Sequence, residues 1–96
     1  MELRNATYGI VGLGIMGGSF AKSIRQNILS QAGSTGKILA CNRSTACLSQ
    51  AKAEGVVDET FTSDRVSEML PLCDVLFICL KHLQALQQVL LALLRL

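Results

Sequence analysis

Short runs of apolar residues alternate along the chain with longer segments in which apolar residues recur every three or four positions. The runs predict buried β-strands over residues 7–12, 37–42 and 74–80, and the segment 56–61 is compatible with a brief further strand. Glycine and serine gather between residues 31 and 36, which predicts a loop. Continuous apolar runs of this length are typical of strands that are covered on both faces.

Helical spacing fills the segments between these strands. The segment 16–29 predicts an amphipathic helix. Its core face is expected to carry Phe20, Ala21, Ile24 and Ile28, and its solvent face Lys22, Arg25 and Gln26. A second helix begins at a capping residue, Ser44 or Thr45, and ends at Gly55. Each of these helices follows a strand at once, so the links between elements are short.

Two further helices complete the pattern. A short one is expected to be capped by Ser63–Asp64 and stopped by Pro71. The tail over residues 83–96 is rich in leucine and carries Arg95 as its only charge, and it is shorter than the roughly 20 residues that span a bilayer. It predicts a helix on the sheet, yet its leucines at 90, 91, 93, 94 and 96 cannot all face one side. An exposed remainder indicates missing sequence or a partner surface.

The alternation of strands and helices predicts an α/β fold with a short parallel sheet in the order 3-2-1-4, joined by right-handed crossovers. The 96 residues accommodate one such domain. Its fourth strand is an edge, so self-association through this strand and the leucine-rich tail is expected. A net charge of +2 with three Phe and one Tyr argues against nucleic acid or an anionic membrane as a partner.

The cysteines indicate neither a metal site nor a disulfide framework. Cys41, Cys47, Cys73 and Cys79 form no CxxC pair, and no histidine lies at metal-ligand spacing beside them. The start of the chain contains Glu2 and no apolar run of the kind found in signal peptides. We therefore expect a cytoplasmic protein with four reduced, mostly buried thiols.

The first strand runs into a glycine turn, Gly12-Leu13-Gly14-Ile15-Met16-Gly17, which opens the first helix. In a GxGxxG turn the first glycine makes the tight turn and the second lets a pyrophosphate approach the backbone. The third allows close packing of helix and strand. Free N–H groups at the helix start then bind the phosphates. Because a second strand follows about 20 to 25 residues later, the pattern predicts a dinucleotide-binding βαβ unit of the Rossmann type.

The end of the second strand predicts the preferred dinucleotide. NAD sites usually place Asp or Glu here, against the ribose 2′-hydroxyl, whereas this chain has Asn42-Arg43-Ser44 and no carboxylate before Glu54. Arg43 can offer several donors to a 2′-phosphate, and Asn42 and Ser44 can donate further hydrogen bonds. NADP is therefore favoured over NAD, against the alternative that Arg43 is a solvated charge.

The segment from Gly9 to Ala21, GIVGLGIMGGSFA, resembles the start of prephenate and arogenate dehydrogenases of tyrosine biosynthesis, above all in the Met-Gly-Gly-Ser at residues 16–19. The similarity extends through Ala53–Glu59 and the strand at 74–80, and so covers residues 7 to about 81. It implies an NADP-binding segment of an oxidoreductase that passes a hydride from prephenate to the cofactor with loss of carbon dioxide. The catalytic and dimerisation domain of that family would be absent from residues 1–96.

The resemblance also implies roles for single positions. Gly12, Gly14, Ile15, Met16 and Gly17 would line the pyrophosphate; Asn42, Arg43 and Ser44 would hold the ribose phosphate; Cys79, Leu80 and Lys81 would pass near the nicotinamide ribose. Two features depart from the family. Lys81-His82 stands where a proline is usual, and the family's catalytic histidine, substrate-binding arginine and helical dimerisation domain would lie beyond residue 96. His82 does not match the position of that histidine. No catalytic residue is therefore assigned in this chain.

Other functions also fit the same turn. A hydroxyisobutyrate or pyrroline-carboxylate reductase type of NADP enzyme is one alternative, although Gly18-Ser19 argues against the hydroxyisobutyrate group, which has a proline shortly after the third glycine. A non-catalytic nucleotide-binding or interaction module, with the leucine tail as its contact surface, is another. A methyltransferase is disfavoured, since Asn42 replaces the acid that its sites also place at the second strand end.

Overall fold

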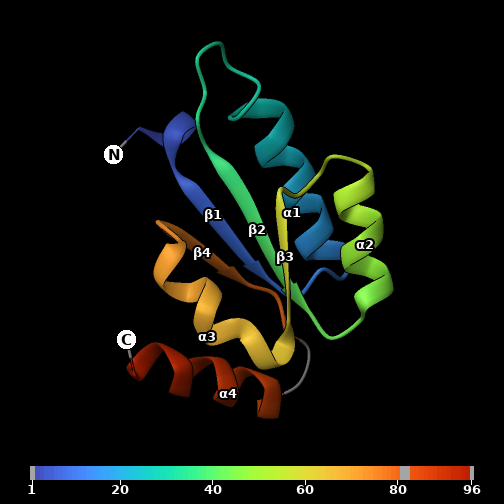
Figure 1. Cartoon of the computed structure of the whole chain (residues 1–96), viewed down its shortest axis with the longest axis vertical. Coiled ribbons are helices and arrows are strands. Elements are labelled where there is room, and N and C mark those ends of the chain that lie inside the picture. The colour runs from blue at the N-terminus through green and yellow to red at the C-terminus, as the bar shows by residue number, and fades with distance from the viewer. Residues whose placement is uncertain (1, 81–82, 96) are drawn as a thin grey trace.

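Four parallel strands form one sheet, seen in the computed structural model, which describes residues 2–80 and 83–95 (Figure 1). The strands are β1 Thr7–Val11, β2 Lys37–Asn42, β3 Glu59–Thr62 and β4 Val75–Ile78. They lie in the order β3-β2-β1-β4, so the predicted α/β fold and strand order are confirmed. The carboxyl ends of β1 and β2 therefore lie side by side at one end of the sheet.

Helices cover both faces of this sheet, α1 and α2 on one and α3 and α4 on the other (Figure 1). Their bounds are α1 Ile15–Asn27, α2 Thr45–Ala53, α3 Val66–Met69 and α4 Leu83–Leu94, with short 3₁₀ turns at Leu3–Asn5, Ser63–Arg65 and Leu70–Leu72. Alternate strand residues supply the two cores, because successive side chains of a strand point to opposite faces. Ile10 and Ile38 pack under α1 and α2, whereas Val11 and Leu39 pack under α3 and α4.

β3 and β4 begin later than predicted, and an aspartate immediately precedes each of them. β3 was expected within 56–61, but pairing begins only after Asp58, whose carboxylate accepts the Ile38 N–H at 2.8 Å. β4 is shorter than 74–80, and the Asp74 carboxylate accepts the Thr7 N–H at 2.9 Å. Both carboxylates thus satisfy backbone donors at the amino ends of neighbouring strands, a task that the apolar pattern does not reveal.

Two expectations about α1 need correction. Ala21 and Ile24 are buried as expected, but Phe20 is 39% exposed and stacks on Phe77 of the edge strand, with ring centroids 5.2 Å apart. Arg25 was expected on the solvent face; its guanidinium instead forms an ion pair with Asp58 at 2.7 Å and donates to the Val56 carbonyl oxygen. Both differences arise from contacts with residues that are distant in sequence, and the spacing of apolar residues along a helix does not report such contacts.

The second and third helices differ in how well their ends were predicted. The Ser44 hydroxyl accepts the Cys47 N–H at 3.3 Å at the start of α2, and Gly55, with φ +74°, follows its end, as expected. The expected cap of the third helix is wrong. Asp64 lies in a preceding 3₁₀ turn, no side chain caps α3, and Pro71 sits within a further 3₁₀ turn. Proline is tolerated there because a residue in the first turn of a helix has no acceptor within the helix for its N–H, so the N–H that proline lacks costs no hydrogen bond.

The leucine-rich tail forms α4 over its described residues and divides its apolar side chains as expected. Val89 is buried and Leu93 packs against the same core, whereas Leu90, Leu91 and Leu94 are 46%, 53% and 83% exposed. Within residues 2–80 and 83–95, no helix is long and apolar enough to cross a membrane.

The four cysteines differ in burial, so their reactivity can test the fold. Cys41 is 2% exposed, and burial, with the nearby charge of Asp64, raises the pKa of its thiol to about 11. Cys47 is exposed, contrary to the expectation of mostly buried thiols.

Brief iodoacetamide treatment at pH 8 should alkylate Cys47 about 100-fold faster than Cys41, because only the thiolate reacts. Peptide mass spectrometry measures the two rates. Equal rates in the folded protein, with a urea-unfolded sample as control, would contradict the packing of β2.

Candidate functional site

The glycine turn joins the carboxyl end of β1 to α1 in a conformation that its first glycine makes accessible. Gly12 has φ +95°, and its N–H donates to the Cys41 carbonyl oxygen at 2.8 Å, which ties the turn to β2. A Cβ at Gly12 would collide with the Cys79 carbonyl oxygen beyond β4. The turn therefore lies between the carboxyl ends of β2 and β4, and residue 12 has room for no side chain.

The other two glycines of the turn have opposite surroundings. A Cβ at Gly17 would collide with the Gly12 carbonyl oxygen and approach Cγ2 of Ile10 at 3.3 Å, so only glycine lets α1 begin this close to β1. A Cβ at Gly14 would meet no atom within 4 Å. Packing within the protein therefore requires Gly17, whereas the space at Gly14 is open to a ligand.

The start of α1 presents backbone donors to this open space. Gly14 is the N-cap residue and offers no side-chain cap, and the first bond within the helix runs from the Gly18 N–H to the Gly14 carbonyl oxygen at 2.9 Å. The N–H groups of the first turn, at Ile15, Met16 and Gly17, have no acceptor inside the helix. With the positive end of the helix dipole, they make a site suited to an anion such as a pyrophosphate.

Asn42, at the end of β2, contacts the turn directly. Its Oδ1 atom accepts the Leu13 N–H at 3.4 Å, a long hydrogen bond between the second strand and the glycine turn. The amide oxygen is thereby directed at the turn, and the two donors of the amide NH₂ group are left for other partners. Sequence reasoning assigned Asn42 to the cofactor alone and missed this contact.

Arg43 and Ser44 continue from Asn42 toward α2 and are both exposed. Arg43 makes no hydrogen bond or ion pair with any residue that the structure describes. Ser44 accepts the Cys47 N–H and so caps α2, while its hydroxyl hydrogen can still be donated. Asn42 thus contacts the glycine turn, and the exposed Arg43 and the Ser44 cap of α2 follow it directly in the sequence.

The residues after β4 reach the same turn from its other side. The Cys79 N–H donates to the Val11 carbonyl oxygen at 2.8 Å, and burial raises the pKa of the Cys79 thiol. The Leu80 side chain packs against the core beneath α3 and α4 and also reaches the glycine turn, where its Cδ2 atom would lie 3.3 Å from a Cβ at Gly12. Lys81, which was also predicted to contact the cofactor, lies outside the described residues.

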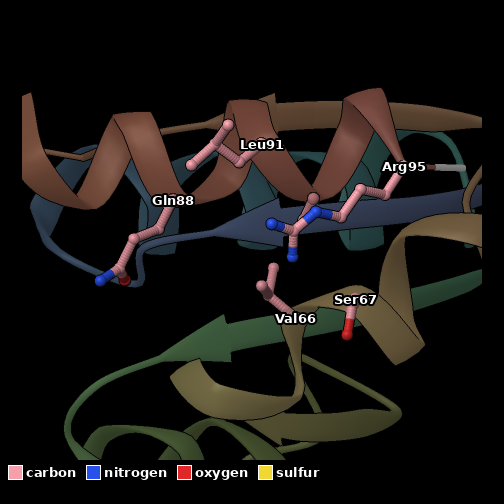
Figure 2. A pocket seen from close by; sticks show the side chains of 6 residues that line it. Val66, Ser67, Gln88, Leu91 and Arg95 are labelled. Atoms are coloured by element: carbon pink, nitrogen blue, oxygen red, sulfur yellow. The ribbon is translucent and has the colours of Figure 1, made fainter.

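The glycine turn is separate from a cavity that described side chains form between α3 and α4. That cavity includes no residue of the turn (Figure 2). Open parallel sheets bind ligands at the carboxyl ends of their strands, which is where the turn, Asn42 and Cys79 meet. Geometry and donor groups therefore indicate the glycine turn at the carboxyl ends of these strands, and not the cavity, as the candidate nucleotide site.

Comparisons with known proteins match most of the chain. A family model described as the NAD binding domain of 6-phosphogluconate dehydrogenase matches residues 7–95. No curated protein sequence matches the chain.

Several solved structures share the fold. Prephenate dehydrogenase from A. aeolicus, in complex with hydroxyphenyl propionate and NAD+, is 28% identical with a TM-score of 0.69 over 92% of this chain. The scyllo-inositol dehydrogenase from Lactobacillus casei with bound NAD(H) and scyllo-inositol is 30% identical with a TM-score of 0.60, also over 92%. The A chain of dipicolinate synthase from Bacillus subtilis, 20% identical with a TM-score of 0.72 over 96% of this chain, shows the fold alone.

The chain is much shorter than these proteins. It covers 28% of the prephenate dehydrogenase chain, 28% of the dipicolinate synthase chain and 26% of the scyllo-inositol dehydrogenase chain. The structural similarity is thus limited to about a quarter of each of these longer chains.

Proposed function

The chain belongs to the family of the NAD binding domain of 6-phosphogluconate dehydrogenase, and on this premise we propose that it is the NADP-binding segment of a prephenate dehydrogenase-like oxidoreductase. It is a dinucleotide-binding, dehydrogenase-like domain. The finer proposal has two parts, the identity of the cofactor and the identity of the reaction, and they rest on different observations.

The proposal that a dinucleotide binds at the glycine turn is supported by the open space beside Gly14. No protein atom lies within 4 Å of the position that a methyl group on Gly14 would take, and this space faces a helix start that no side chain caps. In the proposal, Gly12, Gly14 and Gly17 shape the turn, and the first N–H groups of α1 bind the pyrophosphate. The nicotinamide, when bound, would supply hydride transfer, and the backbone at Cys79 and Leu80 would border its ribose.

The choice of NADP rests on Arg43. Its guanidinium is exposed beside the end of β2 and has no carboxylate partner among the residues that the structure describes. A 2′-phosphate there would receive charge-assisted hydrogen bonds from Arg43 and neutral ones from the Asn42 amide and the Ser44 hydroxyl. No Asp or Glu stands at this strand end to repel it.

The proposed reaction is the oxidation of prephenate, with a hydride passed to NADP and carbon dioxide lost. It is supported by the resemblance of residues 9–21 and by the 28% identity to a prephenate dehydrogenase over 92% of this chain. In this proposal the chain binds and orients the cofactor, and a separate catalytic domain supplies the groups that contact the substrate. Self-association through the free edge of β4 and the exposed leucines of α4 belongs to the same proposal.

Titration of the chain with NADPH and with NADH tests the cofactor. The chain has no tryptophan, so the fluorescence of the reduced nicotinamide reports binding without interference from the protein. We expect tighter binding of NADPH, and Arg43→Ala should weaken it about tenfold or more, because a charge-assisted hydrogen bond is lost. Binding of NADH should stay unchanged.

Lys52→Ala is the matched control, since Lys52 is also an exposed cation, in the last turn of α2 and away from β2. It should leave both affinities unchanged. Equal binding of NADPH and NADH by the unaltered chain would contradict the NADP proposal while keeping the dinucleotide site. A folded chain that binds neither cofactor would contradict the nucleotide-binding proposal as a whole.

NAD is the second candidate cofactor, and a specific observation favours it. Two of the similar structures contain NAD+ or NAD(H), one a prephenate dehydrogenase and one a scyllo-inositol dehydrogenase. The second also keeps other dehydrogenase reactions open as alternatives. The same titration separates the two cofactors, because only NADPH binding depends on Arg43.

A further inference from the structure

A cavity of about 350 Å³ lies between α3 and α4, on the face of the sheet opposite α1 and α2. It is lined by Val66 and Ser67 from α3 and by Gln88, Leu91, Ala92 and Arg95 from α4 and its end (Figure 2). Its volume lies at the lower end of the range that binds small molecules in proteins. None of its residues belongs to the glycine turn or to the end of β2, so it is separate from the proposed cofactor site.

The cavity follows from the spacing of residues along α4. Gln88, Leu91, Ala92 and Arg95 stand three and four residues apart and form one stripe of the helix. Val89 and Leu93 form the neighbouring stripe and hold α4 on the sheet. This stripe therefore faces Val66 and Ser67 of α3, and Ala92 contributes the smallest side chain of the stripe to the cavity wall.

Arg95 is the charged residue among those that line this cavity. Arg95 reaches back from the end of α4 so that its guanidinium faces Val66 across the cavity (Figure 2). On α3, the carboxylate of Glu68 is paired with Arg65 at 3.1 Å. Arg95 forms no ion pair with a carboxylate of residues 2–80 or 83–95. The guanidinium therefore lies beside apolar side chains of the cavity, with no carboxylate of the described residues paired to it.

We propose that this cavity binds a small molecule with a compact apolar body and one carboxylate. The body would contact Val66, Leu91 and Ala92, and the carboxylate would accept two parallel hydrogen bonds from the Arg95 guanidinium, the geometry that this group favours. The Gln88 amide is a further donor on the α4 side of the cavity. An apolar pocket with a few polar groups that fix orientation is the usual form of a small-molecule site.

Methyl NMR of the whole chain, titrated with cyclohexanecarboxylate, tests the proposal. Saturable shifts are expected at the methyl groups of Val66 and Ala92, with no shift at Ile10 in the opposite core. Cyclohexylmethanol, the neutral analogue, should bind about tenfold more weakly, because it lacks the charge-assisted hydrogen bonds. Arg95→Gln should reduce the affinity for the carboxylate by a similar factor and leave that for the alcohol unchanged.

Two further variants control for the fold and for charge. Ala92→Phe should fill the cavity and abolish binding of both compounds, with the Ile10 shifts showing that the sheet persists. Lys52→Gln removes an exposed cation on α2 and should change nothing. The proposal is overturned if no saturable shift occurs up to about 10 mM ligand, or if acid and alcohol bind equally. It is also overturned if the Val66 and Ala92 shifts follow protein concentration alone, because a second copy would then occupy the cavity.

Discussion

Gly17→Ala is expected to destabilise the domain by about 3 kcal/mol or more, enough to unfold much of a small protein. The added methyl group would occupy the position of the Gly12 carbonyl oxygen and crowd Ile10. Backbone at Gly12 cannot move away easily, because its N–H is bonded to β2 and its other side abuts Cys79. Urea unfolding followed by circular dichroism measures the loss.

Gly14→Ala is the matched control for this prediction. The same methyl group meets no protein atom at residue 14, and the backbone there has φ −65°, which any residue adopts. Its stability should therefore stay within about 0.5 kcal/mol of the unaltered chain. Its affinity for either dinucleotide should nevertheless fall about tenfold, because the methyl enters the space proposed for the pyrophosphate.

The two variants together separate packing from binding. A Gly17→Ala protein with an unchanged urea midpoint would contradict the close approach of α1 to β1. A Gly14→Ala protein that binds dinucleotide normally would place the pyrophosphate elsewhere and so overturn the proposed site, even if the fold is right.

Asn42→Asp is expected to reverse the cofactor preference. The new carboxylate can still accept the Leu13 N–H, so the glycine turn keeps its link to β2. It would, however, repel a 2′-phosphate, and like charges in contact cost enough to weaken NADPH binding about 10- to 100-fold. NADH should bind as well or better, because a carboxylate at this strand end accepts hydrogen bonds from the ribose hydroxyls. Fluorescence titration with both cofactors measures the change.

Asn42→Leu tests whether the effect is one of charge or of position. Leucine has a similar shape but offers no acceptor to the Leu13 N–H and carries no charge. It should weaken NADPH and NADH alike, since it loosens the turn that both share. If Asn42→Asp also weakens both equally, Asn42 acts on the turn alone and the 2′-phosphate does not lie beside it.

The sequence was sufficient for the parts of this protein that depend on local pattern. Strand and helix order and the glycine turn follow from apolar spacing and from glycine positions, because burial and backbone conformation depend on neighbouring residues. The sheet order follows from the Rossmann type that the glycine turn indicates. A cap at Ser44 or Thr45 and an end of α2 near Gly55 follow for the same reason, and the structure selects Ser44. Asn42, Arg43 and Ser44 could be named as candidates since they end a strand.

Only the tertiary structure decided what depends on residues distant in the chain. Asp58 and Asp74 accept the N–H groups of Ile38 and Thr7 near the starts of β2 and β1, and Phe20 leaves the core face to stack on Phe77. The contact between Asn42 and Leu13, and the cavity between α3 and α4, also join segments far apart in sequence. Such contacts form between groups that the fold brings together, and no local periodicity encodes the identity of the partner.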